Sequence, residues 1–481
     1  MIYLLFVFSF LIRAVPRVIY KNGFSSDTYF HLRIADLICI NKFRLPKHDP
    51  RYILEHKHLY PPLYHFFLAI FNPTVRLWVE RLSGAIFDTL ILVVTFFFCQ
   101  YYFDFSGKQL FIICFLVGLA PPMFRVYSGP RAFNGSPRVL GQLLFLIKVF
   151  AFLIYLKSGN YLFLIAATTS FLIMLFVSKF ALQVLILSLP VFIWIHWSYL
   201  IVVASGFAFS WLFFRRYVIE LMAAHFKHSV RYFHAQKKLL YPNQITARIY
   251  LRGLWNIIAS WNVRKVFRYF IKNNSALNLV IFCFFYFPVV LIFFIVSEPV
   301  NQEYFMFSLL TLCGFLIFIL ISFRPFLFLG ESERYLEYYL PIAIVAFVHF
   351  VTIFEMRAMI WTAGLYSVLL SVLYIKLAMK GLRKSQSEYE QYKILKDQLA
   401  SRGDGIIFPL YHYICKEIVY ILERRALAYY PGGVDYDLIP RSELQFIYEF
   451  EAIVASSRII EVAERYNVRY ILCRKSQLDR Y

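Results

Sequence analysis

The sequence predicts an α-helical polytopic membrane protein with about eleven transmembrane helices, followed by a small C-terminal α/β domain. Hydrophobic residues make up 60% of the chain and aromatic residues 20%, and the mean hydropathy is +0.61. Several apolar runs reach the roughly 20 residues that a helix needs to cross a bilayer. After Lys380 the composition becomes polar, and short apolar runs alternate with helix-like stretches. We therefore expect a transmembrane domain at 1–380 and an α/β domain at 381–481.

The first apolar run covers residues 2–15, and Arg13, Pro16 and Arg17 follow without a small-residue cleavage site. We therefore expect an uncleaved first span and not a signal peptide. Ten further runs complete the predicted set of spans by their apolar length: residues 82–103, 108–124, 138–156, 160–177, 180–197, 198–214, 277–296, 304–323, 340–355 and 358–377, ten in all.

The stretch from Ala181 to Phe214 allows two interpretations. It forms two helices with a turn at His196–Tyr199, which Pro190 favours, or one tilted helix with a re-entrant piece. With two helices and a cytoplasmic N-terminus, the odd count places the chemically richest segments together on the external face. These segments are residues 16–81, 125–137, 215–276, 324–339 and everything after Lys380.

The basic segment at 215–272 opposes this placement, because it carries twelve Lys or Arg and one acidic residue, Glu220. Such a segment is ordinarily cytoplasmic. Aromatic residues such as Trp255 and Trp261 interleave with its charges, as expected of amphipathic helices that lie flat in the interface, so we keep it external. The net charge of +22 predicts attraction to lipid phosphates in preference to nucleic acid, or else simple anchoring at the membrane surface.

The first long loop holds acidic, histidine and proline residues in a particular order. It reads FSSDTYFHLR from Phe24, then RLPKHDP and LYPPLYHFFL. Asp27 follows the first span, so it should lie at or just above the membrane surface. His31 lies one helical turn beyond it, on the same face. Asp49 precedes a proline, in a sequence that forms a plain turn in most proteins.

The order Asp-x-x-Tyr/Phe-His, a helix, Pro-x-x-Asp-Pro and Tyr-Pro-Pro resembles the first external loop of the GT-C superfamily. These are integral-membrane glycosyltransferases that use polyprenyl-phosphate-linked sugars. The resemblance implies that Asp27 is catalytic, and it makes Asp49 and His31 further candidates. A carboxylate beside apolar walls has a raised pKa and can accept a proton from a hydroxyl. Capping of the following helix by Ser25, Ser26 and Asp27 is a compatible alternative, and an interfacial histidine without a chemical role explains His31 equally well.

Two later loops carry arginines beside rigid turns. Arg131 and Arg138 flank a Pro/Gly-rich turn, and the motif Ser-Pro-Arg-x-Leu-Gly is similar to the corresponding loop of bacterial and archaeal GT-C proteins. The two guanidinium groups would bind a phosphate, or they would only extend toward lipid headgroups. The late loop GESERYLEYYLP is similar to the Arg-Tyr-Leu…Pro pattern of the superfamily, which implies that Arg334 meets the donor phosphate. Glu331 and Glu333 would hold a divalent metal (Mg or Mn), or pair with a neighbouring arginine.

Two features of one class of GT-C enzymes, the oligosaccharyltransferases, are missing from this sequence. The loop at 125–137 contains no Asp or Glu, and no WWD-like tripeptide occurs after Lys380. Oligosaccharyltransferases of the superfamily carry both features, so we do not expect that activity. The ending AERYNVRYILCRKS is similar to the tails of many prokaryotic GT-C proteins.

The resemblance implies transfer of one sugar from a polyprenyl-phosphate donor to a glycan, lipid or protein acceptor at the external face of the cell membrane. A transporter or flippase of lipid-linked sugars, or a polysaccharide polymerase, stays open as an alternative. No CxxC pair occurs, so neither a metal knuckle nor a disulfide framework is indicated.

Overall fold

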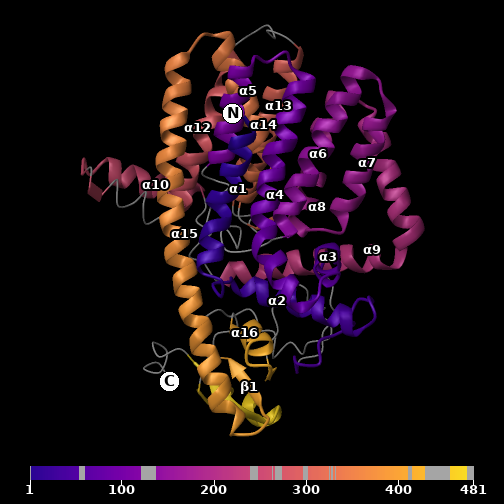
Figure 1. Ribbon diagram of the computed structural model, residues 1–481, viewed down its shortest axis with the longest axis vertical. Helices are drawn as coiled ribbons and strands as arrows, with labels where there is room; N and C mark the ends of the chain where they lie inside the picture. The colour runs from indigo at the N-terminus through magenta and orange to yellow at the C-terminus, as the bar shows by residue number, and fades with distance from the viewer. Residues whose placement is uncertain are drawn as a thin grey trace.

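The computed structural model is a bundle of long helices with other elements laid across one of its ends (Figure 1). α2, α3 and the second half of α9 lie across that end, and the C-terminal elements lie beyond it. The structure describes residues 2–53, 60–120, 137–238, 247–262, 264–265, 274–295, 302–323, 326, 329–330, 332–409, 414–427 and 456–473.

The helices and strands follow one another along the chain in an order that is helical up to residue 400 and mixed after it. They are α1 (Ile2–Ile19), α2 (Ser26–Ile40), α3 (Leu63–Ala69), α4 (Pro73–Tyr102), α5 (Gly107–Leu119), α6 (Pro137–Ser158), α7 (Tyr161–Leu175), α8 (Lys179–Ile195), α9 (Tyr199–Lys238), α10 (Ala247–Ile258), α12 (Asn274–Ile295), α13 (Gln302–Ser322), α14 (Glu333–Ile353), α15 (Arg357–Ala400), β1 (Ile406–Pro409), α16 (Cys415–Tyr420), β2 (Arg425–Ala426), α18 (Ser456–Arg465) and β3 (Val468–Leu472).

Among the described residues, seven helices are long and apolar enough to cross a membrane: α1, α4, α6, the first part of α9, α13, α14 and α15. The chain is thus a helical membrane protein by the length and composition of its helices. Four further apolar helices are shorter, namely α5, α7, α8 and residues 284–294 of α12. Each predicted span overlaps one of these helices, but the number of crossings stays a prediction.

The region around Pro190 forms two helices, as the favoured interpretation has it. α8 continues through Pro190 to Ile195, and α9 begins at Tyr199. Between them, the ring Nδ1 of His196 lies 2.7 Å from the Ser198 hydroxyl and closes the turn. α9 then bends at Phe214, whose φ of −134° and ψ of 21° are not helical, and its second half turns across the end of the bundle (Figure 1).

α15 is a single helix of 44 residues that leaves the bundle without a break. The expected domain boundary at residue 380 falls inside it, so the polar part of α15 is a continuation of the last apolar helix. The helix stops before Gly403, whose φ of +78° is a conformation that favours glycine.

The C-terminal residues contain a three-stranded parallel sheet in the order β2-β1-β3. Strands and helices alternate along these residues, as the alternation of apolar runs and helix-like stretches predicted. The first loop extends this sheet, because the amide of Ile53 donates to the Ala426 carbonyl at 3.0 Å and the amide of Ala426 donates to the Arg51 carbonyl at 2.8 Å. The first loop and the C-terminal segment therefore share one end of the molecule.

The bundle interior is aromatic, and it also buries an ion pair. The rings of Phe98 and Phe150 stack with centroids 4.0 Å apart. Arg13 of α1 lies 3.4 Å from the Asp88 carboxylate of α4, with both side chains buried. Charged side chains inside a membrane bundle face its interior and need a partner, because lipid cannot solvate them. This pair thus fixes α1 against α4.

A test of sidedness uses three exposed positions: Asn41 after α2, Ser401 after α15, and Asn160 in the α6–α7 turn at the opposite end (Figure 1). We expect cysteines at positions 41 and 401 to react with an impermeant thiol reagent from the same side of sealed membranes. In membranes of one orientation, a cysteine at position 160 should react only after the membranes are opened. In membranes of the opposite orientation, position 160 should react first, and positions 41 and 401 only after opening. Labelling of position 41 but not 401 from one side would contradict the arrangement.

Candidate active site at the end of the bundle

α2 carries the first group of candidate residues and presents two different faces. Ser25 precedes it in an extended conformation, and Asp27 lies in its first turn, where the helix dipole favours a negative charge. Helical spacing places Asp27 and His31 on one face and Tyr29 and Arg33 on the other. Both faces are covered, because α2 lies between the bundle and the C-terminal elements (Figure 1).

The carboxylate of Asp27 forms an ion pair with Lys416 of α16, with Oδ1 and Nζ 2.5 Å apart. The Lys416 side chain is 1% exposed, whereas that of Asp27 is 36% exposed. The lysine is thus enclosed by protein while the carboxylate keeps an open side. This arrangement leaves Asp27 accessible to a ligand that approaches the end of the bundle.

The pKa of Asp27 is below its usual value, in contrast to the raised pKa expected from the sequence. Burial would raise the pKa, but the positive charge and hydrogen bond of Lys416 lower it, and His31 and Arg334 add to that lowering. The expectation failed because it considered only the apolar walls and not a lysine from 389 positions later in the chain. Asp27 is therefore ionised at neutral pH.

His31 is buried and neutral. Its Nδ1 lies 2.9 Å from Nε2 of His65 in α3, and burial lowers the pKa of His31 to about 4. The ring also packs against the rings of Tyr60 and Tyr64. A neutral, ring-packed histidine beside a carboxylate can orient neighbouring groups, but it carries no charge at neutral pH.

Tyr60 lies just before α3 and shows which candidate residues lie near one another. Burial and the charge of Asp27 raise the pKa of its hydroxyl, and the positive charges of Arg138, Arg334 and Lys416 oppose that rise. These groups are therefore close enough to Tyr60 to act on it electrostatically. We call the set Asp27, His31, Tyr60, Arg138, Arg334 and Lys416 the Asp27 site.

The two arginines of the Asp27 site stand at the first turns of α6 and α14. Arg138 pairs with Glu337 at 3.8 Å, and both side chains are buried. The guanidinium of Arg334 lies 4.6 Å from the ring centroid of Phe180. Gly330, with a φ of +106°, allows the close approach to Phe180 that precedes this turn. Arg138 is thus held by an ion pair and Arg334 by packing over a ring, and cations fixed in this way can form a preorganised anion site.

Asp49 lies on the other side of α2. Its carboxylate accepts two hydrogen bonds from Arg33, at 2.7 and 2.8 Å, and one from the Arg51 amide at 3.0 Å. Arg33 is six positions after Asp27, which places it on the opposite face of the helix. The structure therefore gives Asp49 the role of fastening the loop and does not bring it to the Asp27 site.

The described residues contain no group of three or more His, Cys, Asp or Glu that could hold a metal. Glu333 is buried and contacts the Ser332 hydroxyl at 3.4 Å; Glu331 and Arg131 lie outside the described residues. The charges that act on Asp27 are positive, so this set does not fit a divalent cation.

Sequence reasoning missed three members of this end of the bundle: Tyr60 as a meeting point, Glu337 as the partner of Arg138, and Lys416. A signal existed for Lys416, because it is a basic residue within a helix whose other buried members are apolar, such as Ile418 and Val419. A lone cation on an apolar face predicts a buried partner. Nothing in the sequence indicates that the partner is Asp27.

The chain matches no family model and no curated protein. The likeness of its loops to the GT-C superfamily therefore stays a resemblance, and the chemistry must be argued from the site.

The pair between Asp27 and Lys416 should contribute to stability at pH 7. We expect a double-mutant cycle with Asp27→Asn and Lys416→Met to give a coupling energy of about 1–2 kcal/mol, between the values for exposed and buried pairs because Asp27 is partly exposed. Since the pKa of Asp27 is lowered, the contribution is present above its ordinary pKa and is lost as the pH falls through the lowered one. Denaturant-induced unfolding of the four proteins of the cycle in detergent measures this coupling energy. Additive effects of the two substitutions would show that the pair is uncoupled.

Proposed function

We propose that this protein is a membrane glycosyltransferase of the GT-C type. It would move a sugar from a polyprenyl-phosphate-linked donor to a hydroxyl of a glycan, lipid or protein acceptor. The observation that carries the proposal is the partly exposed, ionised carboxylate of Asp27 among the cations Lys416, Arg138 and Arg334, at the end of an apolar bundle. Such a site offers a proton acceptor and a place for a phosphate, beside a surface suited to an isoprenoid chain.

The reaction assigns each part of the site a task. The oxygen of the acceptor hydroxyl forms a bond to the anomeric carbon, and the bond between that carbon and the phosphate oxygen breaks. The electron pair of the broken bond stays on the polyprenyl phosphate, whose charge Arg138 and Arg334 stabilise. The hydroxyl proton goes to the Asp27 carboxylate. Attack opposite to the leaving phosphate inverts the anomeric centre.

The low pKa of Asp27 limits its strength as a base but fits this reaction. A hydroxyl becomes acidic as its oxygen bonds to the anomeric carbon, so a weak, fully ionised base can accept the proton late in the step. Lys416 keeps the carboxylate ionised and in place. The open side of Asp27 allows the acceptor to enter and the proton to leave to water.

The proposal includes the orientation of the chain. The first loop, the start of α14 and the C-terminal sheet would form the external, catalytic end, and the C-terminal residues would form a small α/β domain that supplies Lys416. Two observations support a shared end: the pair between Asp27 and Lys416, and the backbone hydrogen bonds of Ala426 with Ile53 and Arg51. The multi-pass chain would reside in the cell membrane.

Asp27→Asn should abolish transfer while the chain stays folded. The amide keeps the shape of the carboxylate but cannot take the proton, and loss of a general base costs roughly 10²–10⁴-fold in rate. The measurement gives membranes that contain the protein a radiolabelled polyprenyl-phosphate sugar and counts label in the acceptor fraction. Asp397→Asn, on the exposed surface of α15, is the matched control and should retain full activity.

Retention of more than about a tenth of the wild-type rate by Asp27→Asn would remove Asp27 from the role of base. Movement of the labelled lipid across sealed membranes, without label in any acceptor, would instead support a transporter or flippase. Growth of a polymer from one labelled unit would support a polysaccharide polymerase.

Arg334→Ala should raise the donor KM by roughly ten- to a hundredfold at saturating acceptor, because a charge-assisted hydrogen bond of this kind contributes about 1.5–3 kcal/mol. Arg334→Lys should recover only part of the loss, since an ammonium restores the charge but not the planar, two-pronged geometry. If alanine lowers the amount of folded protein and leaves the donor KM unchanged, Arg334 has only a packing role beside Phe180.

A further inference from the structure

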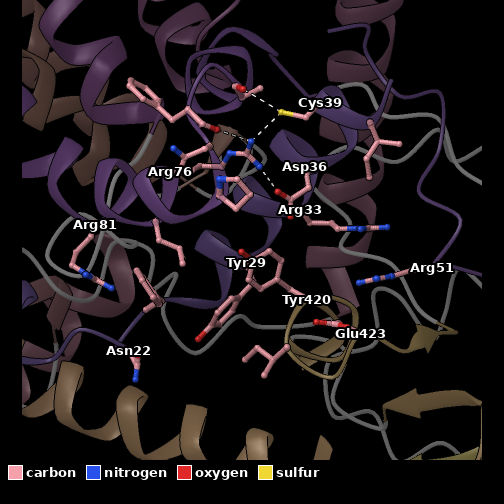
Figure 2. A pocket seen from close by; sticks show the side chains of 18 of the residues that line it. Asn22, Tyr29, Arg33, Asp36, Cys39, Arg51, Arg76, Arg81, Tyr420 and Glu423 are labelled. Carbon is pink, nitrogen blue, oxygen red and sulfur yellow. Dashed lines mark hydrogen bonds and ion pairs between the residues drawn. The ribbon is translucent and has the colours of Figure 1, made fainter. Parts of the chain in front are cut away.

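A cavity lies on the face of α2 opposite Asp27 (Figure 2), with a volume of about 850 Å³. It runs between α2, the start of α4, the polar part of α15 and α16, and we call it the α2–α15 pocket. None of the residues of the Asp27 site lines it. α2 therefore separates the α2–α15 pocket from the Asp27 site.

The described lining of the α2–α15 pocket is strongly basic. It contains six cationic side chains and two acidic ones: Arg33, Arg51, Arg76, Arg81, Lys393 and Lys396, with Asp36 and Glu423. Arg33 is neutralised by Asp49, Arg76 by Asp36, and Lys396 by Glu423.

Three cations are left with no carboxylate within ion-pair distance among the residues that the structure describes: Arg51, Arg81 and Lys393. Arg51 donates to the Val419 carbonyl at 2.8 Å. Arg81 donates to the Lys21 carbonyl and stacks over the Trp78 ring at 4.1 Å. Burial and the nearby charge of Arg33 lower the pKa of Arg51, although the charges of Asp49, Glu423 and Asp36 oppose this lowering. An anion in the pocket would relieve the repulsion between the two arginines.

Two of these cations, Arg51 and Arg81, lie on opposite sides of a pair of tyrosines (Figure 2). Figure 2 shows Arg81 and Asn22 on one side of Tyr29 and Tyr420, and Arg51 on the other side. The two tyrosine rings lie with centroids 5.6 Å apart. Cations that approach one space from different chain segments suit a ligand with several anionic oxygens better than a single carboxylate.

The other end of the pocket is apolar and open. Ile40, Phe43 and Ile70 line it and are 71%, 52% and 68% exposed. Ile40 is eleven residues after Tyr29 on α2, so the two ends are separated by roughly 16 Å along the helix. Exposed apolar side chains next to a basic hollow, at the end of a membrane bundle, match a ligand with an anionic head and a hydrocarbon chain.

We propose that the α2–α15 pocket binds the phosphate head of an amphiphile, with Arg51 and Lys393 supplying positive charge to the phosphate and the chain along Ile40 and Ile70. The inference concerns binding alone and does not rest on the proposed function. Free phosphate and a lipid phosphate share the same head chemistry, so the experiment must distinguish them by the apolar end.

The test is native mass spectrometry of the full chain in a phosphate-free maltoside detergent, with farnesyl monophosphate, inorganic phosphate and farnesol as separate probes. Wild-type protein should bind farnesyl monophosphate at least tenfold more tightly than either other probe. Lys393→Glu reverses a charge on an exposed position of α15 and should weaken that binding tenfold or more; Arg51→Gln should do the same. Lys384→Gln, on the same helix and outside the pocket lining, is the matched control and should bind like the wild type.

The count of bound molecules separates this pocket from the Asp27 site. If the proposed function also holds, wild-type protein binds two molecules of farnesyl monophosphate, Lys393→Glu loses one, and Arg334→Ala loses the other. Unchanged affinity and count in a folded Lys393→Glu variant would overturn the pocket proposal whatever the effect of Arg334→Ala. If inorganic phosphate binds as tightly as farnesyl monophosphate, the pocket does not recognise a hydrocarbon chain. If farnesol binds as tightly, the pocket does not recognise the phosphate. Either result would overturn the proposal.

Discussion

Three ion pairs start from α2 and reach three different parts of the chain: Asp27 to Lys416 of α16, Arg33 to Asp49 of the first loop, and Asp36 to Arg76 of α4. A charge that leaves water needs a partner, because desolvation of an unpaired ion costs several kcal/mol. Each of the three pairs therefore stabilises the position of α2 between the two layers that it contacts. Together the pairs hold the first loop, the bundle and the C-terminal segment at one end of the molecule.

The Asp27 site and the α2–α15 pocket lie on the two faces of α2 and differ in their chemistry. On one face, a single carboxylate keeps an open side while Lys416 holds it ionised, which suits proton transfer. On the other face, Asp49 and Asp36 form ion pairs with arginines. Arg51 and Lys393 line the pocket there and can attract an anion. The distribution of partners, more than the composition of α2, separates a site suited to chemistry from a site suited to binding.

The helical framework was largely predictable because its causes are local. Each apolar run that predicted a span overlaps a helix of the structure, and the turn after α8 follows from residues that are neighbours in sequence, such as His196 and Ser198. The bend of α9 at Phe214 and the continuous length of α15 were not predicted. Both depend on what the helix packs against or projects from, which composition does not contain.

The sequence by itself determined that this is a membrane protein of apolar helices, with Asp27 and His31 one turn apart on a helix after the first span and arginines at the starts of α6 and α14. These features follow from hydrophobic length and helical period, which act between residues close in the chain. Only the tertiary structure decided that Lys416 pairs with Asp27, that Asp49 is held away by Arg33, and that the pKa of Asp27 falls. Each of these depends on which charge lies nearest in space, and in a folded chain that neighbour is often hundreds of residues away.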